Sequence, residues 1–257
     1  MLNYRNINII FILLAAIVAA LAITNRLSFY WFVPLLLLYT GIVFYGSYYV
    51  GSNFFMKVLC SGATERRQIA ISFDDGPATA YTAEILALLK EAQVPAVFFC
   101  IGKNIAGHEE LLQQIDAEGH IVGNHSFSHH FWFDLFSTRK MLADLQLMNA
   151  TAAAAIGKTP VLFRPPYGVT TPNMARVMKQ TNLKAVGWSI RSLDTVIKDD
   201  EQLLTKISSQ LQPGAIVLLH DTSAATLKML PRLIEKARNE GYEFVRIDKL
   251  LNLQPYA

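Results

Sequence analysis

The sequence predicts an α/β protein, a closed or nearly closed barrel of about seven parallel strands preceded by two transmembrane helices. Three observations support this fold class. The first 56 residues form two long apolar stretches, short apolar runs alternate with longer amphipathic ones from residue 68 onward, and ionisable residues gather where the short runs end. Such an alternation of strand and helix is typical of a mostly parallel sheet.

Charge is distributed unevenly along the 257 residues. Residues 1–56 contain two charged side chains, Arg5 and Arg26, whereas residues 57–257 contain 21 Lys and Arg against 20 Asp and Glu. A nearly neutral domain lacks the basic surface that nucleic acids require, so we expect no nucleic-acid partner despite a pI of about 8.8. The two cysteines, Cys60 and Cys100, are too few for a disulfide framework.

The two N-terminal stretches hold 20 and 30 uncharged residues, at 6–25 and 27–56. A helix needs about 20 apolar residues to cross a bilayer core, and aromatic rings prefer its headgroup regions. Aromatic side chains lie near the ends of the second stretch: Tyr30, Trp31, Tyr48 and Tyr49. We therefore predict a two-helix membrane anchor over residues 1–56, in contact with the lipid bilayer through residues 7–50. The alternative is a cleavable signal peptide over residues 1–23, which the second stretch disfavours.

The flanking charges give a weak signal for orientation. Arg5, Lys57, Arg66 and Arg67 would lie on one side of the bilayer and Arg26 on the other. The positive-inside rule then places the large domain in the cytoplasm, although long domains translocate largely regardless of such charges.

The rest of the chain alternates between two hydrophobic periods. The strand-like runs are residues 69–73, 96–101, 120–124, 161–163, 184–190, 215–219 and 243–247, and the helical patterns are residues 82–91, 109–118, 138–156, 171–180, 199–211 and 226–239. Gly119, Gly157 and Gly241 follow helical patterns, where a left-handed residue is favoured. We predict a juxtamembrane linker at residues 57–67 and a catalytic domain at residues 68–257.

Ionisable residues follow several of the predicted strands. The candidates are Asp74, Asp75, His125, His129, Arg164, Asp194, His220 and Asp221. Because parallel strands end at one face of a barrel, we expect these side chains to form an active site there. His220 has the position of a proton donor, whereas Asp194 fits equally a helix cap or a residue that orients a catalytic side chain.

The histidine spacing indicates a metal site. His125 and His129 are spaced i, i+4, which places two rings on one face of a helical turn, and a strand-end aspartate is available as a third ligand. Two histidines and one carboxylate with an open position fit catalytic zinc, with Co, Fe or Mn as alternatives. Arg164 precedes two rigid prolines, so we expect its guanidinium to face a carboxylate.

Four ordered segments resemble the motifs of the polysaccharide deacetylase family, the NodB-like carbohydrate esterases. They are residues 71–77 (ISFDDGP), 125–129 (HSFSH), 164–167 (RPPY) and 218–221 (LLHD). The resemblance extends over about residues 68–250. It implies a distorted (β/α) barrel, often of seven strands, and a divalent metal used to remove acetyl groups from sugars.

The resemblance also implies roles for individual residues. Asp74 would be the general base, His220 the general acid, and Asp75, His125 and His129 the metal ligands. Arg164 would orient Asp74, Asp194 would tune His220, and the Tyr167 N–H would help hold the oxyanion in a substrate site with Pro166 and Leu218. One position departs from the family, because Thr195 follows Asp194 where the family usually has tryptophan, and Trp188 is not in the matching place.

These features predict a metal-dependent hydrolase that removes N-acetyl groups from N-acetylhexosamine-containing glycans. A metal-activated water would attack the acetamide, with Asp74 as base and His220 as acid. A glycan O-acetyl esterase and a catalytically inactive carbohydrate-binding barrel are the alternatives. We expect the protein in a bacterial inner or plasma membrane, with the catalytic domain on the extracytoplasmic face, where the family's polymers are mostly found.

Overall fold

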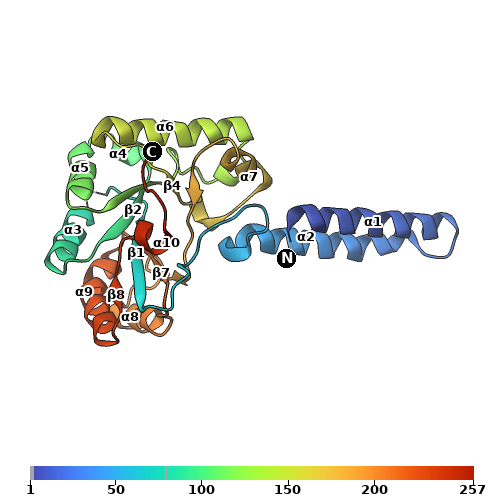
Figure 1. The fold of residues 1–257 in the computed structure, drawn as a ribbon. Coiled ribbons are helices and arrows are strands. Elements are labelled where there is room, and N and C mark those ends of the chain that lie inside the picture. Colours follow the sequence, from blue (N-terminus) through green and yellow to red (C-terminus); the bar gives the residue numbers. More distant parts are fainter. Residues whose placement is uncertain (1–2, 79) are drawn as a thin grey trace.

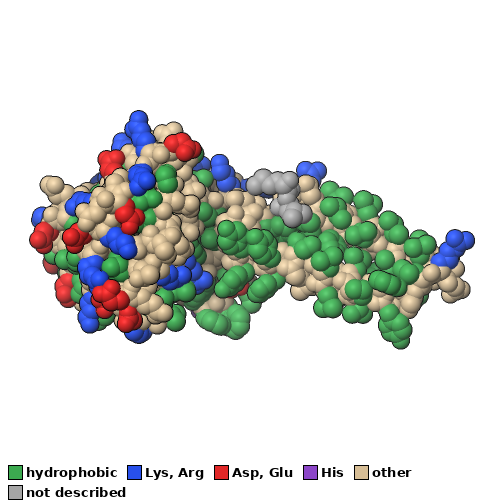
Figure 2. Space-filling view, turned by 90° about the horizontal axis from the view of Figure 1, so that it is seen from below, with side chains coloured by type: hydrophobic (Ala, Val, Ile, Leu, Met, Phe, Trp, Pro, Cys, Tyr) green, Lys and Arg blue, Asp and Glu red, His purple; other side chains and the backbone are tan. Residues whose placement is uncertain are grey.

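The computed structural model describes residues 3–78 and 80–257 and has two parts, a helical hairpin and an α/β body (Figure 1). The hairpin consists of α1 (Tyr4–Ile23) and α2 (Phe32–Tyr48), joined through the short helix η1 (Phe29–Trp31). It projects from the body, and hydrophobic side chains cover its surface (Figure 2). Both segments are long and apolar enough to cross a membrane.

The body is built on parallel strands, as the sequence predicts. They are β1 (Gln68–Asp74), β2 (Ala96–Cys100), β3 (Ile121–Asn124), β4 (Leu162–Phe163), β5 (Lys184–Ala185), β6 (Ile190–Arg191), β7 (Ile216–His220) and β8 (Glu243–Phe244). Seven of them follow the order β5-β4-β3-β2-β1-β7-β6, and β8 pairs with the first residues of β1. The sheet curls into a half-barrel and does not close, because β5 and β6 at its two edges are not paired with each other in the described residues.

Helices surround the outer face of this sheet (Figure 1). They are α3 (Thr82–Glu91), α4 (Gly102–Ile105), α5 (Glu109–Ala117), α6 (Thr138–Ile156), α7 (Pro172–Met178), α8 (Asp200–Ser208) and α9 (Ala224–Asn239). The helix α10 (Ile247–Leu251) instead packs against the interior cluster through Ile247 and Leu250. The short helices are η2 (Val50–Ser52), η3 (Phe133–Leu135) and η4 (Pro166–Gly168). Ser137, Asp199 and Ser223 cap helices by accepting backbone N–H groups. Gly119, Gly157 and Gly241 have the predicted positive φ angles.

Alternation along β1 determines which side chains reach the interior of the half-barrel. Ile71 and Phe73 pack in the cluster shared with the surrounding helices, whereas Ala70 packs with β2 residues in the interior cluster. Since strand side chains alternate in direction, Ser72 and Asp74 share the interior face with Ala70. The strand pattern therefore places one of the two adjacent acids inside the half-barrel.

The predicted single strand at residues 184–190 is wrong, because this run forms β5 and β6 on opposite edges of the sheet. The chain leaves the sheet at Val186, which pairs with Leu59. The Leu59 N–H donates to the Ala185 carbonyl oxygen at 2.9 Å, and the Gly187 N–H donates to the Leu59 carbonyl oxygen at 2.9 Å. Part of the segment predicted as a linker thus pairs with the β5 edge of the half-barrel.

The hairpin is also held at its base by the body. The Thr170 N–H donates to the Ser47 carbonyl oxygen at 3.0 Å, and the Ser47 hydroxyl donates to the Thr170 carbonyl oxygen at 2.7 Å. Val50 and Val58 are buried in a cluster with residues of the body. The last predicted strand, 243–247, is shorter than expected, because α10 begins at Ile247.

Candidate active site

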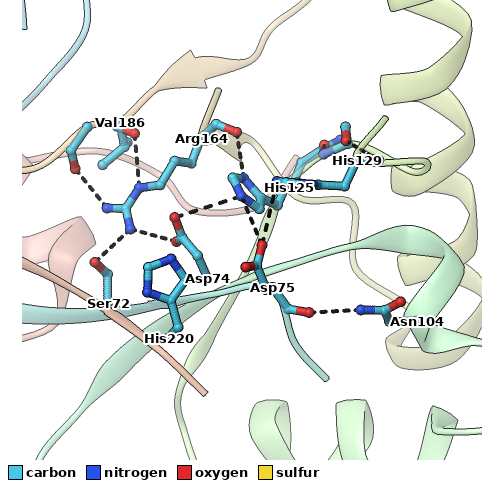
Figure 3. Close-up of polar contacts among 12 residues, drawn as sticks. Ser72, Asp74, Asp75, Asn104, His125, His129, Arg164, Val186 and His220 are labelled. Atoms are coloured by element: carbon cyan, nitrogen blue, oxygen red, sulfur yellow. Dashed lines mark hydrogen bonds and ion pairs between the residues drawn. The ribbon is translucent and has the colours of Figure 1, made fainter. Parts of the chain in front are cut away.

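Two adjacent acids at the end of β1 point in different directions (Figure 3). Asp74 is the last residue of β1 and is 4% exposed. Asp75 has a φ of 78°, a left-handed conformation, and the Asn104 side-chain amide donates to its carbonyl oxygen at 2.8 Å. This turn directs the Asp75 carboxylate away from the interior and toward two histidines.

Asp75, His125 and His129 form a compact set of metal-ligating side chains. One donor atom from each lies within 4.8 Å of the others. The Asp75 Oδ1 atom is 3.6 Å from the Nε2 atoms of both histidines. The predicted helical turn is wrong, because residues 125–130 form a loop in which Ser126 and His129 have positive φ angles. The loop, rather than a helix face, brings the two rings together.

The protonation state and ring orientation of His125 are those of a metal ligand. Its Nδ1 atom lies 2.9 Å from the Arg164 carbonyl oxygen, to which a neutral ring donates its proton. Burial, with a further contribution from His129, lowers the pKa of His125 to about 3. The ring is therefore neutral at pH 7, and its Nε2 lone pair faces Asp75. A hydrogen bond at the far nitrogen is the usual way in which proteins orient a ligating histidine. These three residues thus fit a divalent metal.

Arg164 is a fully buried cation that fixes Asp74. Its Nη1 atom donates to the Asp74 Oδ1 atom at 2.7 Å and to the Ser72 hydroxyl at 2.8 Å. Its Nε and Nη2 atoms donate to the Val186 and Gly187 carbonyl oxygens, so all three guanidinium nitrogens are hydrogen-bonded. The prediction that Arg164 faces a carboxylate is confirmed by this geometry.

The free oxygen of Asp74 faces the histidines. Its Oδ2 atom is 3.8 Å from the His125 Nε2 atom, while Arg164 holds the other oxygen. Burial raises the pKa of Asp74, and the Arg164 charge opposes this rise. A carboxylate with a raised pKa accepts a proton more readily than an exposed one does.

His220 lies across the interior from the histidine pair, at the end of β7. Residues Asp74 and His220 are register partners on neighbouring strands. The His220 Nδ1 atom is 2.7 Å from the Asp194 Oδ1 atom, and the His220 N–H donates to Asp194 Oδ2. Burial lowers the pKa of His220, but the hydrogen bond and charge of Asp194 outweigh burial and raise this pKa to about 9. The His220 ring is therefore an imidazolium at pH 7.

The remaining predicted residues surround these groups. Tyr167 has a φ of 60°, and its backbone N–H makes no hydrogen bond to a described residue. Its ring centroid lies 4.7 Å from that of His129. Pro166 is buried in the same short helix, and Leu218 is buried two residues before His220 on the same face of β7. The structure thus brings every predicted site residue to one end of the half-barrel.

Known proteins resemble the chain over this same region. Residues 61–186 match the family model for polysaccharide deacetylase. The peptidoglycan-N-acetylmuramic acid deacetylase PdaA of Bacillus subtilis is 31% identical over 194 residues, which cover 74% of this chain and 73% of that enzyme. The chain belongs to the polysaccharide deacetylase family. Relatives such as PdaA are named as deacetylases, which are hydrolases that act on carbon–nitrogen bonds.

Two further comparisons define the extent of the likeness. The peptidoglycan-N-acetylglucosamine deacetylase PgdA of Listeria monocytogenes is 31% identical over 188 residues, but these span only 40% of its length. The crystal structure of the peptidoglycan N-acetylglucosamine deacetylase Bc1960 superposes with a TM-score of 0.75 at 24% identity, covering 78% of this chain and 95% of that one. The second comparison supports the polysaccharide deacetylase fold.

Several residues around the candidate active site could not be identified from the sequence. Ser72 and Asn104 hold Arg164 and the Asp75 backbone, and the Thr226 and Ser192 hydroxyls donate to the Asp194 carboxylate. Their side chains are not ionisable, so the search for ionisable residues at strand ends passes over them. Ser72 could have been found from the strand pattern, because it lies two residues before Asp74 and therefore on the same face of the strand.

Exposed aromatic side chains lie next to the candidate active site. They do not include residue 195, because Thr195 stands where an aromatic residue is usual in the family. Phe131 and Trp132, which follow His129, are 68% and 56% exposed. The Phe131 ring centroid is 6.3 Å from that of Tyr167, so this aromatic surface adjoins the candidate site.

Proposed function

We propose that the protein removes N-acetyl groups from N-acetylhexosamine units of a glycan, with peptidoglycan as the substrate class. One observation carries this proposal: the three candidate metal ligands lie beside a buried carboxylate, Asp74, whose register partner on the neighbouring strand is the imidazolium of His220. The two curated relatives described above are named as deacetylases of N-acetylglucosamine and N-acetylmuramic acid in peptidoglycan.

We propose zinc as the metal held by Asp75, His125 and His129. When bound there, a divalent ion supplies Lewis acidity, which lowers the pKa of a coordinated water and polarises the acetyl carbonyl. Two imidazoles and one carboxylate leave an open position for substrate. Cobalt, iron and manganese accept the same donor set.

Different residues around the ligands accept and donate the protons of the reaction. The Asp74 Oδ2 atom accepts the proton of the attacking water, because Arg164 occupies the other oxygen. The Tyr167 N–H donates to the carbonyl oxygen as negative charge develops on it. As the carbon–nitrogen bond breaks, the His220 Nε2 atom donates its proton to the leaving amine, while the Nδ1–H stays on the ring and donates to the Asp194 carboxylate.

The protonation of His220 favours amide over ester hydrolysis. An amine is a poor leaving group unless it is protonated, whereas an alkoxide leaves an ester with less assistance. Because Asp194 keeps His220 charged at neutral pH, the site provides the acid that an amide requires. The O-acetyl esterase and the inactive carbohydrate-binding barrel become outcomes of the test below.

The hairpin supports a membrane location. We propose that α1 and α2 span a bacterial inner membrane and that the body lies on its extracytoplasmic face, where peptidoglycan is found. The exposed apolar side chains along both helices fit a lipid environment.

The test uses the full chain in neutral detergent with purified peptidoglycan. Zinc-loaded protein should release acetate and produce an equal amount of free amine. Chelation should abolish this release, and zinc or cobalt should restore it. Acetate without new amine would identify an esterase, and binding without acetate would identify an inactive barrel.

A matched pair of histidine variants tests the metal assignment. His129→Ala should lose both metal and turnover, because it removes one of three ligands. The neighbouring His130 is exposed and lies outside the ligand set, so His130→Ala should keep both. Full metal content and full rate in His129→Ala would overturn the assignment.

A further inference from the structure

A cavity lies where the hairpin meets the body, and we call it the junction cavity. Its volume is about 720 Å³. Tyr48 and Tyr49 at the end of α2 form one side, and Trp188, Arg191 and Lys206 are among the residues of the other. None of the proposed metal ligands, acids or bases lines it.

Trp188 separates the junction cavity from the candidate active site. A side-chain carbon at Gly168 would lie 2.5 Å from the Trp188 ring, so the ring packs directly on the loop that carries Tyr167. The Arg164 guanidinium lies 5.7 Å from the centroid of the same ring. Trp188 is therefore both a wall of the junction cavity and a packing partner of residues of the candidate active site.

The charged lining of the junction cavity is entirely positive. Arg191 and Lys206 supply the charges, and no Asp or Glu among the described residues lines the cavity. Neither cation forms an ion pair with a described residue. The amides of Gln210 and Gln212 and the Ser61 hydroxyl add neutral donors. Two uncompensated cations beside amide and hydroxyl donors are complementary to a phosphate group.

The position of the cavity indicates where such a phosphate comes from. Tyr48 and Tyr49 are 60% and 52% exposed and mark the end of the apolar helix that meets the body. Tyrosine rings prefer the headgroup level of a bilayer. If the hairpin is embedded, the junction cavity therefore opens at the depth of the lipid phosphates.

We propose that the junction cavity binds the phosphate of an anionic phospholipid headgroup through Arg191 and Lys206. This inference rests on the membrane insertion in the proposed function, but not on the deacetylase activity. A bound headgroup would contact Trp188 and would hold the body at a defined height above the bilayer.

The experiment measures lipid affinity of the full chain in neutral detergent, using short-chain phosphatidylglycerol and phosphatidylcholine. A basic side chain near a membrane surface contributes about fivefold to the affinity for anionic lipid, so two contribute about 25-fold together. Phosphatidylglycerol should bind more tightly than phosphatidylcholine by about this factor, and R191Q/K206Q should abolish the difference. The matched control, R139Q/K249Q, removes two exposed cations outside the cavity and should retain the difference.

Three outcomes would overturn the proposal. They are equal affinity for the two lipids, an unchanged preference in R191Q/K206Q, and competition by inorganic phosphate at the same concentration as the lipid, which would identify a soluble anion as the ligand. Flotation with neutral phosphatidylcholine vesicles separates the premise from the inference. A chain that does not float refutes membrane insertion, whereas a chain that floats without lipid preference refutes only the headgroup site.

Discussion

At the scale of single residues, backbone geometry gives two identical neighbours different environments. Asp74 continues β1 and points into the half-barrel, where Arg164 holds it. Asp75 adopts a left-handed conformation and faces His125 and His129. One carboxylate is therefore placed to move a proton and the other to bind a cation.

This difference leads to a prediction for the two asparagine variants. Asp75→Asn should lose most of its bound zinc, because a charged ligand is removed. Asp74→Asn should retain zinc but lose about 10²–10⁴-fold in kcat, the usual contribution of a general base. Metal analysis and acetate release on the same preparations check both. Equal zinc loss in the two variants would contradict separate roles.

The pair of His220 and Asp194 predicts the alkaline limb of the pH profile. A general acid must be protonated, so kcat/KM should fall as pH rises through the His220 pKa of about 9. Asp194→Asn removes the carboxylate that raises this pKa, so the fall should begin at lower pH. Ser209→Ala serves as control, because it removes an exposed hydroxyl that donates to the Lys206 carbonyl oxygen and to neither of these residues. An unchanged alkaline limb in Asp194→Asn would exclude His220 as the group that titrates.

The main residues of the candidate site could be predicted from sequence because their types are unusual at strand ends. An apolar strand that runs into two aspartates, or into His220 and Asp221, has few structural explanations. The supporting hydroxyls and amides could not be found in this way. Thr226 and Asn104 are common residue types in ordinary helices, and only the folded chain brings them to Asp194 and Asp75.

At the scale of elements, helices were easier to predict than the edges of the sheet. The predicted helices at residues 82–91 and 138–156 match α3 and α6, because an amphipathic period is a local signal. For α6, the cap residue Ser137 adds a second local signal. The split of residues 184–190 depends on Leu59, which pairs with Val186 from 127 residues earlier in the chain. The local sequence of residues 184–190 does not predict a pairing with so distant a residue.

Gly187 tests whether the segment around Leu59 belongs to the sheet. A Cβ atom at this position would lie 2.7 Å from the Cys60 Sγ atom. Gly187→Ala should therefore destabilise the protein by about 1–3 kcal/mol, the usual cost of overpacking. Cys60→Ala in the same chain should recover part of the loss. Gly41→Ala is the control, because nothing lies within 4 Å of its added carbon. Thermal unfolding measures all three, and equal Tm values for Gly187→Ala and the parent would contradict the packing.

At the scale of the whole molecule, the segment after the hairpin is a structural part of the body. Val50 and Val58 are about 5% and 4% exposed, and they pack with residues such as Phe163 and Met174. Ser61 pairs with Ala215 on the other side of the gap in the half-barrel. A truncation that removes this segment therefore removes core side chains together with strand pairing.

Two fragments test this dependence. Residues 50–257 retain the segment, whereas residues 63–257 lack both valines and the pairing of Leu59. Each buried valine contributes about 1.5–3 kcal/mol, so the shorter fragment should unfold at a clearly lower temperature. Both fragments lack the same two apolar helices, which makes the longer one a matched control. Equal Tm values would show that the body does not need residues 50–62.

The two apolar helices also constrain the orientation of the molecule in the membrane. If α1 and α2 both span, the loop at residues 24–28 and the body must lie on opposite faces of the bilayer. Arg26 is the only charged residue in the loop, whereas Arg5, Lys57 and further cations lie on the side of the body. The positive-inside rule therefore favours a cytoplasmic body, but large domains translocate largely regardless of such charges. A peptidoglycan substrate requires the body outside. A C-terminal alkaline phosphatase fusion should then be active and a C-terminal green fluorescent protein fusion dark, and fusions within the loop should give the reverse pattern. An active phosphatase in the loop with a fluorescent C-terminal fusion would place the body in the cytoplasm and exclude peptidoglycan outside the membrane as its substrate.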